Sequence, residues 1–193
     1  MTRIISLLIN NTKNDRNCQD MNTNLKKLVF IALYTAIFVV LSIYGTINLY
    51  GMKLTLQNLP IYVGAISLGS IAGATIGFAG MFINQMITYG FTATTLFWVI
   101  PQTIIGGVCG YLFENKKVKV GGGLKFWICI ITLQVALTIL NTIIIAIDAV
   151  VFGYYSFIVV FGPLILRMMV SILTGIVYCL VLPAINRMTK KIH

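Results

Sequence analysis

Long apolar runs separated by short polar segments dominate the chain. They extend over about Leu25–Tyr44, Leu54–Leu68, Ser70–Tyr89, Thr94–Phe113, Leu124–Ile147 and Pro163–Asn186. A membrane-spanning helix needs about 20 apolar residues, whereas the strands of a membrane barrel alternate apolar and polar positions. Because these runs are continuous, the sequence predicts an all-α integral membrane protein, a bundle of six transmembrane helices. The second run is short and contains Pro60.

The start of the chain is polar and rich in asparagine. We therefore divide the sequence into an N-terminal tail, residues 1–24, and a membrane domain, residues 25–193. Met21 is followed by a polar and basic segment, so we expect it to be a natural start and residues 1–20 to be dispensable. The apolar run Ile4–Ile9 is too brief for the core of a cleaved signal peptide.

Composition and charge support a membrane location and give the orientation. Of the 193 residues, 59% are hydrophobic and 9% charged, and mean hydropathy is +0.96, whereas soluble domains carry about 25% charged residues. The net charge of +10 gathers before the first run, between the fourth and fifth, and after the last, at Lys26, Lys27, Lys116, Lys117, Lys119, Lys125, Arg187, Lys190 and Lys191. Basic loops stay inside, so both termini are predicted to be cytoplasmic, and the charge does not indicate nucleic acid.

Polar side chains inside the runs gather in the predicted outer half. Gln134, Asn141 and Asp148 are seven residues apart and share one helix face. The other polar positions of this half are Thr95, Trp98 and Gln102 on the fourth run, Asn84 and Gln85 on the third, and Gln57 and Asn58 on the second. Polar groups in lipid need partners, so this cluster predicts a pocket that opens to the outside.

Arg167 is the single charged residue within the last apolar run. Its guanidinium cannot be neutralised in a protein, and placing it in a transmembrane helix costs roughly 2.5–3.5 kcal/mol. It needs a counter-charge, a water-filled cavity or an anionic ligand. It lies one turn inside the helix if the helix starts at Pro163, and about 13 Å deep if it starts at Ile158. The alternative to a ligand pocket is hydrogen bonding between helices, with Asp148 paired to Arg167.

Small residues recur every four positions in two runs. Gly69, Gly73 and Gly77 open the third run, and Ala32 and Ala36 lie in the first. This spacing lets two helix backbones approach closely. It is compatible with packing inside the bundle or with docking of another membrane subunit.

Several classes of protein are not indicated. The chain has no GxxxxGK[ST] loop for ATP and no HExxH, its one histidine is His193, and its four acids form no close pair in the runs. We therefore predict no enzyme, no metal site and no cofactor in this chain. The four cysteines form no CxxC pair and are expected to be small buried hydrophobes. A stand-alone secondary transporter or channel remains the rival, which transport by the purified protein alone would favour.

Over about residues 25–190 the chain resembles the substrate-binding S components of energy-coupling factor (ECF) vitamin importers, most of all those of the folate, pantothenate and riboflavin types. The resemblance rests on the six-run pattern and on short elements, which are Ala32-Leu33-Tyr34-Thr35-Ala36, Leu59-Pro60-Ile61 with Gly64, the glycines at 69, 73 and 77, Asn141-Thr142, Tyr154 and Arg167. It implies a high-affinity vitamin-binding subunit in a bacterial plasma membrane. Ala32 and Ala36 are then expected to dock a transmembrane T component, while two partner ATPase subunits hydrolyse ATP.

The resemblance also gives the candidate site residues their roles. Arg167 is expected to hold a carboxylate or phosphate of the ligand, which favours folate or pantothenate, and Trp98 to stack on a ring. Hydrogen bonds are expected from Asn141, Gln102 and Gln134. The remaining candidates are Asn84, Gln85, Asp148 and Thr95, and the loops 45–53 and 90–93 are expected to act as lids.

Overall fold

The structure is a computed structural model that describes residues 24–49, 52–115, 118–121 and 123–189. An N-terminal helix, Asn24–Tyr44, leads into a two-stranded antiparallel hairpin and then into further helices. In chain order these elements are β1 (Thr46–Leu49), β2 (Met52–Thr55), α2 (Leu59–Leu68), α3 (Ser70–Tyr89), α4 (Thr95–Glu114), α5 (Leu124–Val151), α6 (Phe157–Phe161) and α7 (Leu164–Thr189). The predicted tail lies outside the described residues, apart from Asn24.

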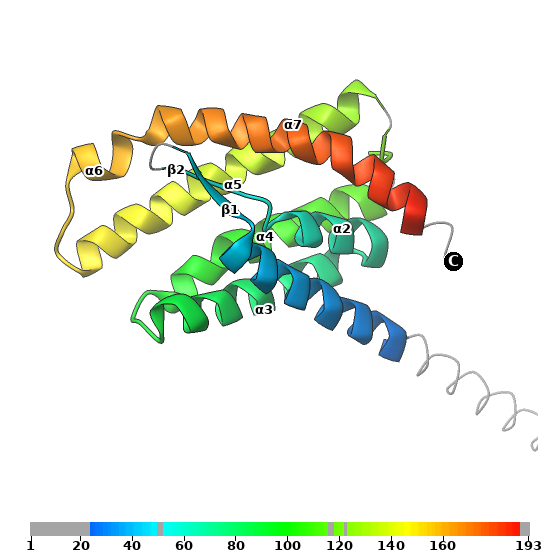
Figure 1. Cartoon of the computed structure of the whole chain (residues 1–193), viewed down its shortest axis with the longest axis horizontal. Coiled ribbons are helices and arrows are strands. Elements are labelled where there is room, and N and C mark those ends of the chain that lie inside the picture. The colour runs from blue at the N-terminus through cyan, green and yellow to red at the C-terminus, as the bar shows by residue number, and fades with distance from the viewer. Residues whose placement is uncertain (1–23, 50–51, 116–117, 122, 190–193) are drawn as a thin grey trace, which may run out of the picture.

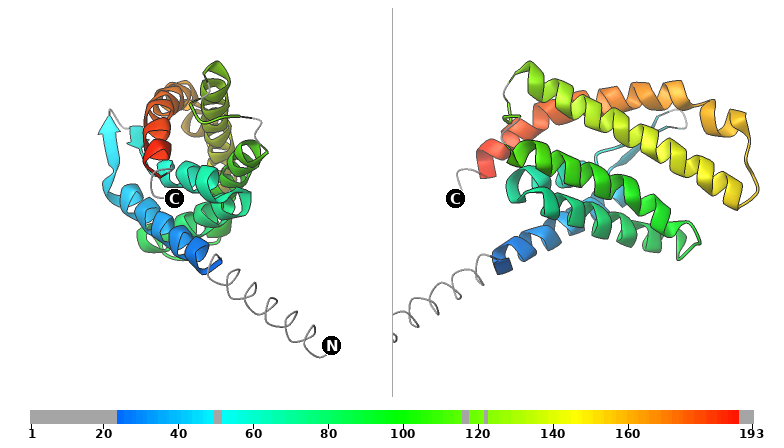
Figure 2. Two further views of the ribbon diagram at one scale, coloured as in Figure 1. Left: turned by 90° about the vertical axis from the view of Figure 1, so that its right-hand side faces the viewer. Right: turned by 180° about the vertical axis from the view of Figure 1, so that it is seen from behind.

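Two pairs of helices form the frame of the molecule. The helices α3 and α4 run together along one side and α5 and α7 along the other, with α2 between them at one end (Figure 1). The start of the N-terminal helix and the end of α7 lie at the same end of the bundle (Figure 2). Lys26, Lys125 and Arg187 belong to this end, which we call the basic end.

In the part of the chain that the structure describes, five helices are long and apolar enough to cross a membrane, so the chain forms a helical membrane bundle. They are the N-terminal helix, α3, α4, α5 and α7. The second predicted span, Leu54–Leu68, is shorter than expected, since α2 has 10 residues. At 1.5 Å per residue it is about 15 Å long, half of a hydrocarbon core of about 30 Å.

The late start of α2 has a local cause. Pro60 lies in its first turn, where proline is favoured because no hydrogen bond is lost there. The residues before it form the hairpin, in which Thr46 pairs with Thr55 and Leu49 with Met52. The predicted outer loop 45–53 is therefore mostly β-structure, and its residues 50 and 51 lie outside the described part of the chain.

The ends of α5 and α7 decide where two charged residues lie. The helix α5 continues to Val151, so Asp148 belongs to the helix and not to the following loop. A short helix, α6, precedes Gly162 and Pro163, and α7 begins at Leu164. The backbone N–H of Arg167 donates to the Pro163 carbonyl oxygen at 2.9 Å. Arg167 therefore lies one turn inside the last helix, the shallower of the two predicted depths.

The regularly spaced glycines join α3 to α4. A Cβ on Gly73 would lie 2.5 Å from the carbonyl oxygen of Gly106, and one on Gly77 would lie 2.5 Å from that of Gln102. Only hydrogen side chains allow the two backbones to come so close. The glycines thus pack inside the bundle, and the alternative of a glycine docking face for another subunit is wrong.

An apolar core fills the basic end of the bundle. Its largest fully buried members include Tyr62, Phe126, Ile130, Tyr178 and Leu182. Of the four cysteines, Cys109 and Cys179 are buried and Cys129 is half-buried, all as free thiols, while Cys18 lies outside the described residues. This core closes the molecule at the basic end.

Candidate functional site

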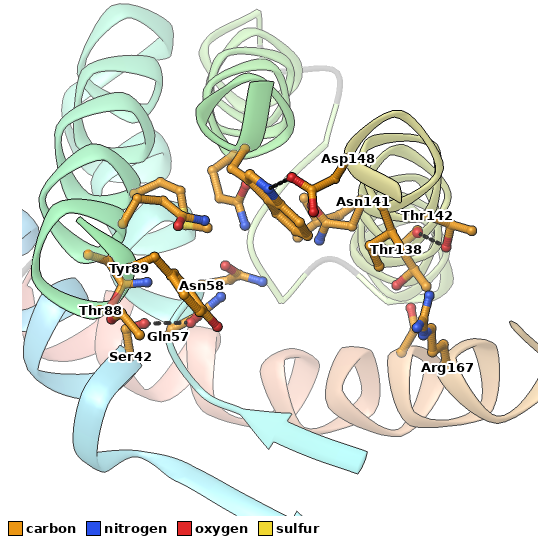
Figure 3. A pocket seen from close by; sticks show the side chains of 18 of the residues that line it. Ser42, Gln57, Asn58, Thr88, Tyr89, Thr138, Asn141, Thr142, Asp148 and Arg167 are labelled. Carbon is orange, nitrogen blue, oxygen red and sulfur yellow. Dashed lines mark hydrogen bonds between the residues drawn. The ribbon is translucent and has the colours of Figure 1, made fainter. Parts of the chain in front are cut away.

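A polar cavity of about 880 Å³ opens between the two helix pairs, away from the basic end (Figure 3). Its wall includes the end of α3, the start of α4, the outer two thirds of α5, the start of α7 and the residues just before α2. Cavities of this size hold drug-sized ligands. The arrangement places a large, polar, accessible hollow within a membrane bundle.

Most of the predicted site residues come together on this wall. Eight candidates line the cavity, namely Arg167, Asn141, Trp98, Gln102, Gln134, Asn84, Gln85 and Asp148. Gln57 and Asn58 line it too. Residues from five segments of the chain therefore meet where the polar pattern predicted an outer pocket.

Thr95 does not line the cavity, so its predicted place in the site is wrong. It is completely buried, and its Oγ1 accepts a hydrogen bond of 2.8 Å from the backbone N–H of Thr92. Thr95 therefore stabilises the turn that precedes α4. Its neighbour Thr94 lines the cavity instead.

Sequence reasoning missed several hydroxyl groups on the wall. They include Ser42, Thr88, Thr92, Thr94, Thr138, Thr142, Ser171 and Thr174. A signal existed for two of them, because Ser171 and Thr174 follow Arg167 by four and seven residues and share its helix face. Serine and threonine are common in apolar helices and bond to their own backbone, as Thr142 does to the Thr138 carbonyl at 2.8 Å, so they give a weak pattern.

Asp148 accepts hydrogen bonds from three side chains and does not pair with Arg167. Its Oδ1 accepts from Thr94 Oγ1 at 2.5 Å and Trp98 Nε1 at 3.4 Å, and its Oδ2 accepts from Tyr154 Oη at 2.5 Å. Asp148 and Arg167 are separated in the cavity by Asn141 (Figure 3). The alternative in which Asp148 neutralises Arg167 is wrong. The bond to Asp148 also raises the pKa of the Tyr154 hydroxyl, because it favours the protonated phenol.

Arg167 keeps an unused hydrogen-bond donor at the cavity wall. Its Nη1 is buried and has no partner. The other buried side-chain polar atoms without a partner, among the residues described, are Asn58 Oδ1, Gln102 Oε1, Asn141 Oδ1 and Ser171 Oγ. All five belong to residues that line this one cavity. Since leaving a buried polar group unpaired costs about 1–3 kcal/mol, their concentration at one place indicates a site that is completed by a ligand or by water.

Gln134 joins the cavity to the apolar core below it. Its Oε1 accepts from the completely buried Tyr62 hydroxyl at 2.9 Å, and its Nε2 donates to Thr174 Oγ1 at 3.5 Å. These contacts connect α2, α5 and α7 at the cavity floor. They also fix the orientation of the amide, with its oxygen directed at Tyr62.

The described part of the chain contains no group of three or more His, Cys, Asp or Glu side chains that could hold a metal ion. The unpaired groups are amide oxygens, a hydroxyl and a guanidinium nitrogen. Such a set recognises an organic molecule with hydrogen-bond donors and a negative group.

Residues 22–187 match the model of a family described as ECF-type riboflavin transporter, S component. The chain belongs to this family. As an S component it is a subunit of a multi-pass membrane importer for vitamins, and its partners are a T component and ATPase subunits. This agrees with five long apolar helices around a polar cavity. Ala32 and Ala36 are both exposed on the N-terminal helix, where a T component could reach them.

Proposed function

We propose that this S component captures an anionic water-soluble vitamin, folate or pantothenate, from outside the plasma membrane of a bacterium. The observation that carries the proposal is that Arg167 lines a ligand-sized cavity while its buried Nη1 has no partner. A carboxylate there would form a charge-assisted hydrogen bond with the guanidinium. Asp148 is already occupied by three donors, so it leaves this positive charge available.

Folate is the better fit of the two vitamins. The cavity offers the aromatic side chains of Trp98 and Tyr89, on which a flat ring can stack. The unpaired oxygens of Asn58, Gln102 and Asn141 can accept hydrogen bonds from the ring N–H and NH₂ groups. An acidic end at Arg167 and a ring against α2 and α4 give the ligand a defined orientation.

The vitamin is then delivered by the partners of this chain. The S component carries no ATP site of its own, and we propose that two ATPase subunits supply the energy after docking through Ala32 and Ala36. The hairpin β1–β2 and the turn at residues 90–93 are candidates for lids over the cavity. No cofactor in this chain takes part.

The first prediction concerns the charge of Arg167. Arg167→Gln keeps a donor but removes the charge, and Arg167→Ala removes both. Because loss of one partner of a buried charge pair costs about 2–5 kcal/mol, we expect the affinity for folate or pantothenate to fall at least roughly 30-fold. Calorimetric titration of the purified protein with each vitamin measures the effect. Arg187→Gln is the matched control, since Arg187 is exposed in the last turn of the same helix.

Riboflavin is the second candidate, because the description of the matching family names it. Riboflavin is uncharged, so its binding depends on the amide groups and the aromatic side chains more than on the charge of Arg167. The same titration separates the two proposals. Tight riboflavin binding that survives Arg167→Gln, without measurable binding of folate or pantothenate, would replace the anionic vitamin by riboflavin.

A further inference from the structure

The carboxylate of Asp148 connects three segments that are distant in the sequence. Thr94 precedes α4, Trp98 lies in its first turns, and Tyr154 follows α5. All three donate to Asp148, and a carboxylate has about four acceptor positions. The Asp148 carboxylate therefore has little remaining capacity to bind a ligand. Asp148 therefore connects the end of α5, the start of α4 and the loop that follows α5.

The bond to Trp98 has a consequence for the cavity wall. An indole has one N–H donor, and burying that donor without a partner is unfavourable. Asp148 provides the acceptor from the neighbouring helix, as the dashed line at Asp148 in Figure 3 shows. Trp98 is half-buried and lines the cavity. With its N–H bonded to α5, the ring is restrained at the cavity wall.

The carboxylate of the proposed ligand belongs to a different part of the wall from Asp148. Arg167 attracts that carboxylate, and Asp148 repels it. Figure 3 shows Asp148 and Arg167 apart from each other, with Asn141 between them. The two charges thus have different partners, neutral protein donors for Asp148 and the ligand for Arg167.

We infer that Asp148 is a positioning residue that holds the Trp98 ring in place for the vitamin and does not itself bind the vitamin. The inference rests on the proposed function only in taking a vitamin as the ligand. It reassigns Asp148, which the sequence placed among the substrate-binding residues. Trp98 remains the group that contacts the ligand ring.

The first arm of the test uses no vitamin. The chain has two tryptophans, so Trp127→Phe leaves Trp98 as the only one. Time-resolved fluorescence anisotropy then reports how freely the Trp98 ring moves. We expect Asp148→Asn to add a fast component to the anisotropy decay, because an NH₂ group replaces one acceptor oxygen. An unchanged decay would overturn the inference.

The second arm is a double-mutant cycle between Trp98→Phe and Asp148→Asn. Its ligand is whichever of folate, pantothenate and riboflavin binds the unmutated protein most tightly. If Asp148 acts through Trp98, Asp148→Asn lowers the affinity about tenfold when Trp98 is present but less than about twofold in the Trp98→Phe background, a non-additive result. Equal losses in both backgrounds would show direct contact with the ligand and overturn the inference.

Two further variants control for the loss of a negative charge and for a variant that fails to fold. Glu114→Gln also removes one negative charge, but Glu114 lies at the far end of α4, where it accepts from the Ser70 N–H at 3.3 Å. It should leave the Trp98 decay unchanged. Where Asp148→Asn fails to fold by thermal unfolding, Asp148→Leu removes both acceptor oxygens at nearly the same side-chain size, and it too should free the ring. Failure of all three vitamins to bind would count against the proposed function and leave the anisotropy result standing.

Discussion

At the scale of single residues, the unpaired polar atoms define this site better than any motif does. Each of them costs free energy in the folded protein without ligand, yet all five belong to residues that line one cavity. The hydrogen-bonded groups around them hold neighbouring side chains in place. Asp148 holds Trp98, and Tyr62 holds Gln134, so that the remaining atoms point in defined directions.

The contact between Tyr62 and Gln134 gives a prediction at this scale. Tyr62→Phe leaves the Gln134 oxygen buried without its donor, which should lower the free energy of unfolding by about 1–3 kcal/mol. It should also weaken vitamin binding, because the amide can then turn. Thermal unfolding and calorimetric titration of the purified protein check both effects.

Tyr44→Phe is the control for this change, since Tyr44 is 83% exposed at the end of the N-terminal helix. Tyr44→Phe should change neither the free energy of unfolding nor the affinity for the vitamin. A Tyr62→Phe protein as stable as the parent would mean that the hydroxyl of Tyr62 contributes nothing to the cavity floor.

The sequence predicted which residues meet at the cavity better than it predicted what each one bonds to. The seven-residue spacing of Gln134, Asn141 and Asp148 fixes a shared helix face, whatever the exact ends of the helix. The roles of Thr94 and Thr95 depend on the residue at which α4 begins, and sequence patterns leave such boundaries uncertain. The bonds of Asp148 to its three donors follow from tertiary packing, which no local pattern encodes.

At the scale of helices, continuous apolar runs located the five long spans and the end of the short α2, but they placed the start of α2 five residues too early. A run of apolar residues does not distinguish a helix from a buried strand, and residues 52–55 before α2 are a strand. The spacing of the glycines predicted a close helix contact. Its partner, α4, became clear only from the structure, through Gly106 and Gly110.

The close packing of α3 against α4 gives a prediction at Gly106, and the next residue, Gly107, provides a matched control. A Cβ on Gly106 would lie 2.3 Å from the carbonyl oxygen of Gly73, whereas one on Gly107 would meet only the Ala74 Cβ at 3.7 Å. Gly106→Ala should therefore destabilise the protein by about 1–3 kcal/mol. Gly107→Ala should be neutral or stabilising by about 0.5–1 kcal/mol, because alanine favours helix. Thermal unfolding of the two variants compares them, and equal stabilities would show that this packing can relax.

At the scale of the whole molecule, the ends and faces of the bundle differ in chemistry. Lys26, Lys125 and Arg187 belong to the end where the N-terminal helix starts and α7 ends (Figure 2). The cavity wall is built from the end of α3 and the starts of α4 and α7, at the other end. Much of the N-terminal helix is exposed, including Ala32 and Ala36. Small side chains on an exposed apolar helix allow the close approach of a partner helix.

Docking of the T component provides the prediction at this scale. Ala32→Trp with Ala36→Trp should block assembly with the T component and ATPase subunits, because two indoles prevent close helix approach. Vitamin binding by the isolated S component should be unchanged. Co-purification of the complex and calorimetric titration measure the two properties separately.

The matched control places the same pair of tryptophans on another exposed face. Ile172 and Ile176 are four residues apart on α7 and are 44% and 36% exposed, so Ile172→Trp with Ile176→Trp should still assemble. Normal assembly of the Ala32 and Ala36 variant would exclude this face as the docking surface.

The close contact of Gly73 with Gly106 also bears on how the protein can move. Two backbones in direct contact cannot slide without a clash, so α3 and α4 behave as one rigid body. On the other side, α5 and α7 pack less closely, since a Cβ on Gly175 would lie 3.3 Å from Ile131 Cγ1 and 3.4 Å from its Cα. We therefore expect any change in cavity shape around the cargo to come from the α5 and α7 half, with α3 and α4 staying together.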